Sequence, residues 1–143
     1  MMLRFCSCIF VCSGRIIDNT EWNNRLTNNF LWTKELIEKH VRSSQADANV
    51  VVIMAHANNS HKHWRFFHGM RDYIDYELYN SVPILYLNGD THSWVEQSDF
   101  YEQWNWKRIT VDGNAREKPL KVTVDASSYV KTVDEAFSFV RFY

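Results

Sequence analysis

Three residues whose side chains can bind metal ions follow two apolar runs of the sequence. His56 comes directly after the run at 49–55, and Asp90 and His92 come just after the run at 83–88. In open α/β sheets, binding sites collect outside the carboxyl ends of the strands. Carboxylate oxygens and imidazole nitrogens are ligands of divalent ions, so the three side chains are candidates for a metal site. The spacing leaves an equally good alternative, in which Asp90 caps a turn and His92 is an ordinary loop residue.

The spacing of the candidate ligands and the residues next to them affect the direction in which their side chains point. Asp90 and His92 are two positions apart, a spacing that can point both side chains to one side of an extended or turning backbone. Gly89 precedes them and would allow a tight turn. Asn58 and Asn59 are candidate lining residues because they follow His56 in the chain. Four other histidines are expected to have no functional role. His61 and His63 lie at the start of a predicted helix, His68 lies inside it, and His40 lies near the end of the other helix.

Other catalytic signatures do not occur in the sequence. It contains no Gly-x-Ser-x-Gly elbow, no Gly-rich phosphate loop and no His-Glu-x-x-His. Cys6, Cys8 and Cys12 lie far from any histidine, and Cys-Ser-Cys is not the spacing of a closed zinc site. We expect these thiols to lie on a buried strand. The same apolar run at 5–12 has an alternative interpretation as a very short secretory signal, which leaves the localisation of the protein open.

The elements that would position the candidate site are predicted from the hydrophobic pattern. Short apolar runs at 5–12, 49–55 and 83–88 are typical of strands covered on both faces, as in a parallel or mixed sheet. Apolar residues recur at helical spacing over about 20–42 and 61–80, which predicts two helices packed on the sheet. The order strand, helix, strand, helix, strand indicates an α/β layered fold.

The last third of the chain has a different pattern. Residues 107–112 and 120–125 alternate polar and apolar side chains, as antiparallel strands with one wet face do. Residues 126–143 form a weakly specified tail with an apolar end. The sequence therefore predicts one domain over 1–143 with its core at about 5–125. Its fold class is α/β, with a layered mixed sheet flanked by helices and antiparallel strands at the end.

Composition narrows the classes of partner. Among 143 residues there are 16 Lys plus Arg and 17 Asp plus Glu, so the formal net charge of -1 gives no reason to expect a nucleic-acid partner. Lys107 and Arg108, close to two tryptophans, are therefore interpreted as edge-strand residues. No apolar run approaches the roughly 20 residues that a membrane crossing needs, so no membrane partner is expected.

The two apolar runs and the residues after them resemble the carboxyl-terminal half of the calcineurin-like metallophosphoesterase superfamily. In that family one strand ends in a metal-binding His, the next ends in Gly-His-x-His, and antiparallel strands finish the domain. Residues 50–56, Val-Val-Val-Ile-Met-Ala-His, resemble the first element, and residues 85–92, Leu-Tyr-Leu-Asn-Gly-Asp-Thr-His, resemble the second. Residues 18–25 look like the start of the helix before the histidine strand. Asp90 stands where the family usually has the first His of its motif.

The resemblance implies a hydrolase of phosphoesters with two divalent metal ions, of Mn, Zn or Fe. It places His56 and Asp90 on one metal and His92 on the other. The family's Gly-Asp-x-x-Asp and Gly-Asn-His motifs, which supply the other ligands, do not occur in this sequence. A truncated domain is therefore implied, with weak metal binding and little or no activity without an amino-terminal half. Loss of that half would expose an apolar sheet edge, so we also expect self-association.

A non-catalytic interaction module on the same α/β scaffold is the alternative from another class. Such a module would bind its partner through exposed aromatic side chains, which are enriched at protein interfaces. The candidates are Trp94, Tyr101, Trp104 and Trp106. In-frame coding sequence upstream of Met1 that contained the family's missing motifs would favour the enzyme over this module.

Overall fold

The computed structural model describes residues 19–113, 119–127 and 130–141. Its helical elements are α1 (Asn19–Ile37), the π-helical η1 (Glu38–Arg42), the 3-10 turn η2 (His61–His63), α2 (Trp64–Tyr76), the 3-10 turn η3 (Phe100–Glu102) and α3 (Val133–Ala136). Its strands are β1 (Val51–Ala55), β2 (Ile84–Asn88), β3 (Val95–Gln97), β4 (Trp106–Thr110), β5 (Leu120–Val124) and β6 (Phe137–Arg141). The strand predicted at 5–12, with its three cysteines, lies outside the described residues.

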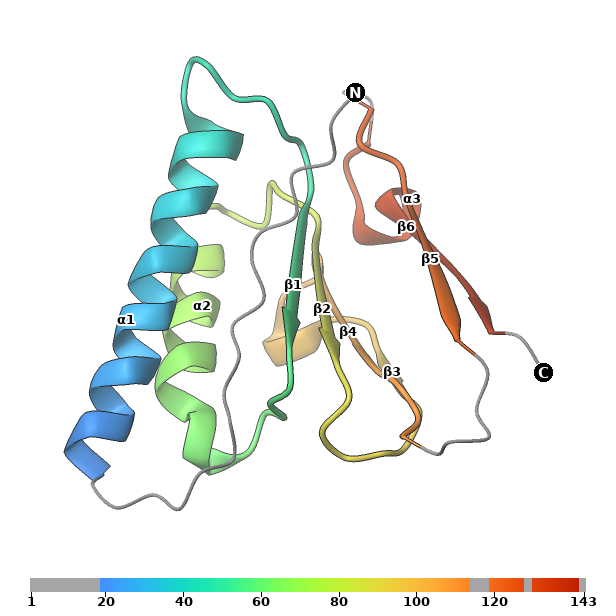
Figure 1. Ribbon diagram of the computed structural model, residues 1–143. Coiled ribbons are helices and arrows are strands. Elements are labelled where there is room, and N and C mark those ends of the chain that lie inside the picture. The colour runs from blue at the N-terminus through green and yellow to red at the C-terminus, as the bar shows by residue number, and fades with distance from the viewer. Residues whose placement is uncertain (1–18, 114–118, 128–129, 142–143) are drawn as a thin grey trace.

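The main sheet has four strands in the order β1-β2-β4-β3. β1, β2 and β4 are parallel, and β3 is antiparallel to β4. Helices α1 and α2 cover one face of this sheet, and the antiparallel pair β5-β6 lies with α3 on the other side (Figure 1). The fold is therefore α/β, with a mixed sheet flanked by helices and antiparallel strands near the end, as the sequence predicts.

Two clusters of buried side chains fill the space on either side of the main sheet. The cluster on the helix side joins Met70 and Ile74 of α2 to Ile84 and Trp106 of the sheet. The cluster on the other side joins Leu85 of β2 to residues of β4, α3 and β6. Neighbouring residues of β2 thus belong to opposite layers, as the period of a strand requires. This double coverage explains why β1 and β2 are continuous apolar runs.

The expectation that residues 107–112 form a strand with one wet face is wrong. β4 is an interior strand parallel to β2, and it is mostly buried. β5 pairs instead with β6, which is antiparallel to it. Lys107 and Arg108 are consequently not edge residues. The buried ammonium of Lys107 forms ion pairs with Asp134 at 2.7 Å and Glu96 at 3.3 Å.

The carboxyl-terminal segment is better specified than the sequence suggests. It contains α3, whose first turn is closed by a capping box between Thr132 and Glu135. It also contains β6, which supplies Phe137 to the second core cluster. The short length of α3 gives too few periods for the pattern to predict it.

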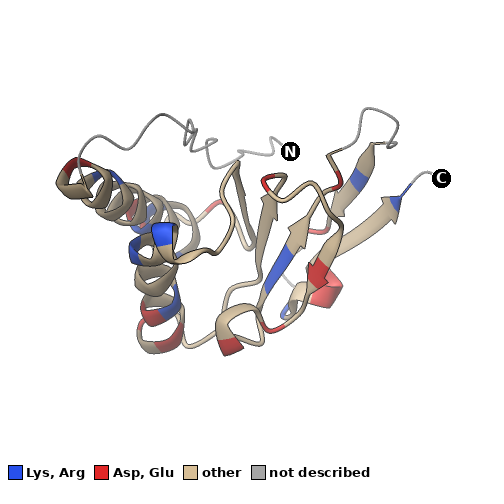
Figure 2. Ribbon diagram, turned by 90° about the horizontal axis from the view of Figure 1, so that it is seen from below, with Lys and Arg blue, Asp and Glu red and all other residues tan. Residues whose placement is uncertain are grey.

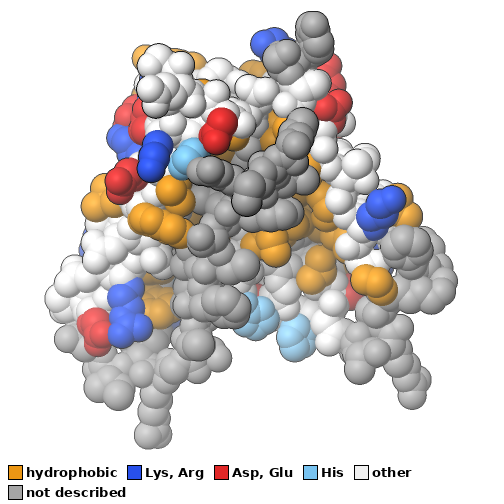
Figure 3. Space-filling model, turned by 45° about the horizontal axis from the view of Figure 1, so that its top comes forward, with side chains coloured by type: hydrophobic (Ala, Val, Ile, Leu, Met, Phe, Trp, Pro, Cys, Tyr) orange, Lys and Arg blue, Asp and Glu red, His pale blue; other side chains and the backbone are white. Residues whose placement is uncertain are grey.

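Charged and apolar groups are both distributed over the surface of the described residues. Lys, Arg, Asp and Glu are interspersed along helices and strands rather than separated by sign (Figure 2). Hydrophobic side chains reach the surface in several places on the face shown in Figure 3. Among the described helices, none has the length and apolar character that a membrane crossing requires. Self-association through apolar surface stays a prediction.

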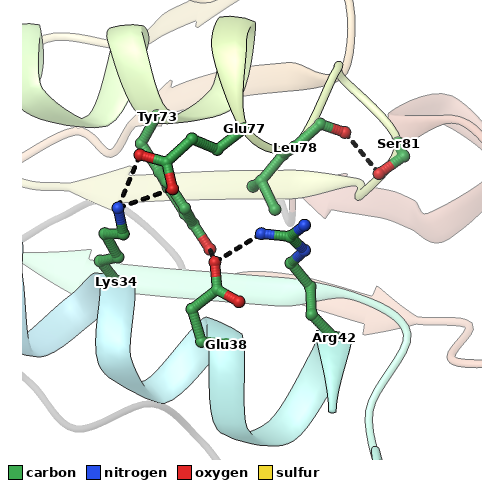
Figure 4. Close-up of polar contacts among 7 residues, drawn as sticks. All are labelled: Lys34, Glu38, Arg42, Tyr73, Glu77, Leu78 and Ser81. Atoms are coloured by element: carbon green, nitrogen blue, oxygen red, sulfur yellow. Dashed lines mark hydrogen bonds and ion pairs between the residues drawn. The ribbon is translucent and has the colours of Figure 1, made fainter. Parts of the chain in front are cut away.

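Polar contacts connect α1 and η1 to α2 (Figure 4). The Lys34 ammonium donates to both carboxylate oxygens of Glu77, at 2.6 and 2.7 Å. The Tyr73 hydroxyl donates to Glu38 Oε1 at 2.8 Å, and Arg42 donates to the same oxygen at 2.6 Å. Burial raises the pKa of Glu38, but the hydrogen bonds from Tyr73 and Arg42 and the positive charges nearby outweigh it, so the pKa lies below its usual 4.5.

Replacing Tyr73 by Phe tests this contact. We expect Tyr73→Phe to lower the free energy of unfolding at pH 7 by about 1 kcal/mol, because the Glu38 carboxylate loses a donor. The lowered pKa of Glu38 means that its contribution is present above the unfolded pKa and is lost as the pH falls through the folded pKa. Urea unfolding at pH 7 and pH 3 should therefore show a smaller difference from the wild type at pH 3.

Tyr76→Phe is the matched control, because the Tyr76 side chain is on the same helix and largely exposed. Its stability should equal that of the wild type at both pH values. An equal loss of stability in Tyr73→Phe at pH 7 and pH 3 would contradict a role for the ionised Glu38.

Candidate functional site

His56 and Asp90 come together at the carboxyl ends of β1 and β2. The two strands are parallel neighbours, and Ala55 of β1 is in register with Asn88 of β2. The residues that follow them therefore leave the sheet at the same edge. His56 Nε2 lies 3.9 Å from Asp90 Oδ1, with the histidine side chain more exposed than the carboxylate. This pair is the part of the predicted site that the structure assembles.

His92 has a different setting from the pair. It is exposed and has a left-handed backbone, with φ of 52°. A non-glycine residue is uncommon in this conformation, and the strain is of the kind found at functional sites. The His92 ring packs against Gly113, where an added Cβ would collide with the ring. This contact aims the ring toward the segment after β4.

Gly89 does not have the predicted role in a tight turn. Its φ is not in the left-handed region, so the turn after β2 does not depend on the conformational freedom of glycine. An added Cβ would lie 3.8 Å from His56 Nδ1 and 3.4 Å from Val111 Cγ2. Both are ordinary van der Waals distances, so a Cβ at this position would be accommodated beside His56.

His56, Asp90 and His92 supply too few converging ligands for a metal ion. A catalytic zinc site usually has three protein ligands and one open position. Within residues 19–113, 119–127 and 130–141, no group of three His, Cys, Asp or Glu side chains is placed to hold a metal ion. His56 and Asp90 supply two donors, and His92 does not join them in such a group. The described residues therefore do not form a complete metal site.

Comparison with known proteins gives no further identification. No family model matches the chain, and no curated protein or solved structure shows a significant match to it. The functional argument therefore depends on the residues and geometry of the strand ends.

His63 belongs to the same region, although its position at a helix start suggested a surface residue without function. It ends η2, is half-buried and lies 5.8 Å from the Trp22 ring. Its Nδ1 is 2.8 Å from the carbonyl oxygen of Asn58, which can only accept, so Nδ1 donates and Nε2 keeps a lone pair. Burial lowers the pKa of His63, against the carbonyl and the charge of Asp90, which raise it. The net effect is a lowered pKa of His63, which favours the neutral imidazole.

A small, mostly apolar pocket lies next to His63, between α1, α2 and the end of the sheet. Its lining residues are Leu26, Asn29, Ala55, Ala57, His63, Phe66, Phe67 and Tyr86. The Tyr86 hydroxyl donates to the carbonyl oxygen of Ala57 at 2.6 Å. Burial raises the pKa of Tyr86, and the negative charge of Asp90 adds to this effect. The hydroxyl is thus a fixed donor that orders the loop after β1.

Two polar side chains on the sheet near this edge have buried atoms without a hydrogen-bond partner in the described residues. Asn88, which is 3% exposed, has no hydrogen-bond partner for either atom of its amide, and Arg108 has none for its buried Nε. In a parallel pair, residues in register face the same side of the sheet. Arg108 is in register with Tyr86, so both lie on the helix side. Neither residue was predicted to belong to the site, because Asn88 ends an apolar run and Arg108 lies in an alternating segment.

Of the four aromatic residues proposed for an interaction module, Trp104 alone is exposed, and Tyr101 is half-buried. Trp106 is completely buried, which contradicts its expected exposure. Trp104 is exposed, as expected. Trp94 is half-buried, with the Arg141 guanidinium 4.2 Å from its ring centroid. Trp106 belongs instead to the buried cluster on the helix side of the sheet.

Proposed function

We propose that this chain is the carboxyl-terminal part of a metal-dependent phosphoester hydrolase of the calcineurin-like metallophosphoesterase type. The approach of His56 to Asp90 at the ends of two adjacent parallel strands is the observation that supports this proposal. The family motifs that the sequence resembles require a histidine strand beside a second strand with ligands at its end. Antiparallel strands after the second ligand strand also agree with that order.

The proposed roles follow the residues of the two motifs. His56 and Asp90 would donate to one divalent ion of Mn, Zn or Fe, and His92 to the other. When bound, a pair of such ions activates water and neutralises the phosphoryl oxygens of the substrate. The further ligands, including a bridging carboxylate, would come from an amino-terminal half of the domain. The chain by itself is therefore proposed to bind metal weakly and to have little or no turnover.

The partner of this chain is then the amino-terminal half, and β1 offers a place for it. Among the described strands, β1 is at the edge of the main sheet, with β2 as its neighbour. Val51 N–H donates to the Pro83 carbonyl on the β2 side, so the backbone groups of Val52 and Met54 point the other way. An apolar edge of this kind favours the addition of another strand.

Metal stoichiometry tests the proposed site. The purified chain is loaded with Mn²⁺ or Zn²⁺ and dialysed, and the bound metal is measured. We expect the wild type to retain less than one equivalent, in keeping with weak binding, and His56→Ala and the Asp90→Ala, His92→Ala double variant to retain none, because His and Asp side chains are the ligands. His61→Ala is the control, since His61 is exposed on η2 and should not change the stoichiometry. No retained metal in the wild type, or equal retention in every variant, would reject the assignment.

A further inference from the structure

Arg108 is held in place by neutral groups on the helix side of β4. Its guanidinium carbon lies 5.1 Å from the centroid of the Phe100 ring, which offers its face to a cation. Its Nη1 donates to Oδ1 of Asn59, a residue of the loop that follows His56. These two contacts orient the planar fork but leave its charge without a counterion.

The absence of an acid partner separates Arg108 from its neighbour on the strand. Lys107 faces the opposite layer and pairs with Asp134 and Glu96. Among residues 19–113, 119–127 and 130–141, no carboxylate forms an ion pair with Arg108, and its buried Nε has no hydrogen-bond partner. Burial lowers the pKa of Arg108, against the neighbouring tyrosines, which raise it. A half-buried cation without a counterion is costly, and a bound anion would relieve that cost.

Arg108 is also close to the strand-end pair. Arg108 is in register with Tyr86, and the Tyr86 hydroxyl donates to the carbonyl oxygen of Ala57, the residue directly after His56. Asn59 connects the guanidinium to the loop that leaves His56. The unpartnered amide of Asn88 lies on the same side of β2 as Tyr86, immediately before the turn that carries Asp90. Two unpartnered donors, Arg108 Nε and the Asn88 amide nitrogen, therefore lie on the strands whose neighbours and ends carry His56 and Asp90.

We propose that Arg108 binds the phosphoryl group of an anionic ligand beside His56 and Asp90. A guanidinium presents parallel N–H donors that match two oxygens of a phosphate, and this geometry favours phosphate over a small monovalent anion. Arg108 is then a substrate-positioning residue at the site. The identity of the ligand as a phosphoester rests on the proposed function, whereas phosphate binding at Arg108 does not require a metal.

Titration of inorganic phosphate into the full chain in EDTA, followed by calorimetry, tests this assignment. We expect the wild type to bind phosphate and Arg108→Gln to bind it at least about tenfold more weakly, since a charged hydrogen-bonded pair is lost. Arg65→Gln is the matched control. Arg65 also lies against an aromatic ring, 4.8 Å from the centroid of Trp64, and has no acid partner in the described part of the chain, but it is exposed on α2. Its replacement should leave phosphate affinity unchanged.

Arg108→Lys is the second variant, because it keeps the cation but not the planar fork. Its affinity should lie between those of the wild type and Arg108→Gln, and the thermal unfolding of all variants is recorded to confirm that they are folded. Equal affinity in the wild type and Arg108→Gln, equal loss in Arg65→Gln, or no binding by the wild type would overturn the assignment. The phosphate titration is done without metal, so its result is independent of the metal test. If the wild type retained no metal but bound phosphate through Arg108, the hydrolase would be rejected and the anion site retained.

Discussion

Trp106→Ala is expected to lower the free energy of unfolding by about 3–5 kcal/mol, the usual cost of truncating a fully buried large aromatic residue. The Trp106 side chain is completely buried on the helix side of β4. Its ring centroid is 4.7 Å from that of Phe100 and 5.7 Å from that of Tyr101. It also reaches Phe67 of α2 at 6.4 Å, so the truncation removes contacts of the sheet with both η3 and α2.

The loss should come from packing alone. The indole Nε1 of Trp106 has no hydrogen-bond partner within the described residues, so no polar contact is lost with the ring. Trp104→Ala removes the same side chain two positions earlier, where it is 52% exposed, and should change stability by less than about 0.5 kcal/mol. Urea unfolding followed by far-UV circular dichroism gives both values. Similar losses in the two variants would contradict the interior position of β4.

Two of the four strands of the main sheet, β1 and β2, could be predicted because they are locally distinctive. Val51 to Ala55 and Ile84 to Asn88 are apolar without interruption, which is typical of strands covered on both faces. The helix predicted over about 20–42 corresponds to α1 with its π-helical continuation. The helix predicted over 61–80 ends earlier, because Tyr79 and Asn80 have left-handed backbones that no periodicity can indicate.

Strand pairing in the last third could not be predicted from alternation. An alternating pattern indicates that one face of a strand is less apolar, but it does not identify the neighbouring strand. Lys107 looks like a solvent-facing residue in the sequence, yet its ammonium is buried against Asp134, which is 27 residues away. The burial of this ammonium depends on the ion pair with Asp134 of α3, and α3 itself was not predicted.

The candidate site was predictable where it depends on strand ends and not where it depends on burial. His56 and Asp90 follow two parallel strands, and that topology is sufficient to bring them to one edge. The half-buried state of His63 depends on its contacts with Asn58 and Trp22, which local sequence does not specify. The unpaired charge of Arg108 likewise results from the position of β4 in the sheet.

Asn105 connects the turn after α2 to the segment before α3. Its side chain is completely buried just before β4. The Nδ2 group donates to the carbonyl oxygens of Asn80 and Lys131, each at 3.0 Å. The first carbonyl belongs to the left-handed turn after α2, and the second comes just before the capping box of α3. One amide thereby satisfies two backbone acceptors in different layers of the fold.

Asn105→Asp is expected to cost at least about 3 kcal/mol at pH 7, because it replaces the donor of two hydrogen bonds by an oxygen that faces two carbonyls. Burial should raise the folded pKa of the new carboxyl above its unfolded value of about 3.9. The destabilisation is then smallest below the unfolded pKa, where the protonated group can still donate. It grows as the pH rises to the folded pKa. Urea unfolding of the variant and the wild type at several pH values measures this difference.

Asn28→Asp is the control for the charge itself, since Asn28 is exposed on α1. Its effect should stay within about 0.5 kcal/mol of the wild type at neutral pH. Asn105→Ala removes the donor without adding a charge, so its cost should be smaller than that of Asn105→Asp at pH 7 and independent of pH. If Asn105→Asp lost no more stability than Asn28→Asp, the amide of Asn105 would not be the link between the turn after α2 and the start of α3.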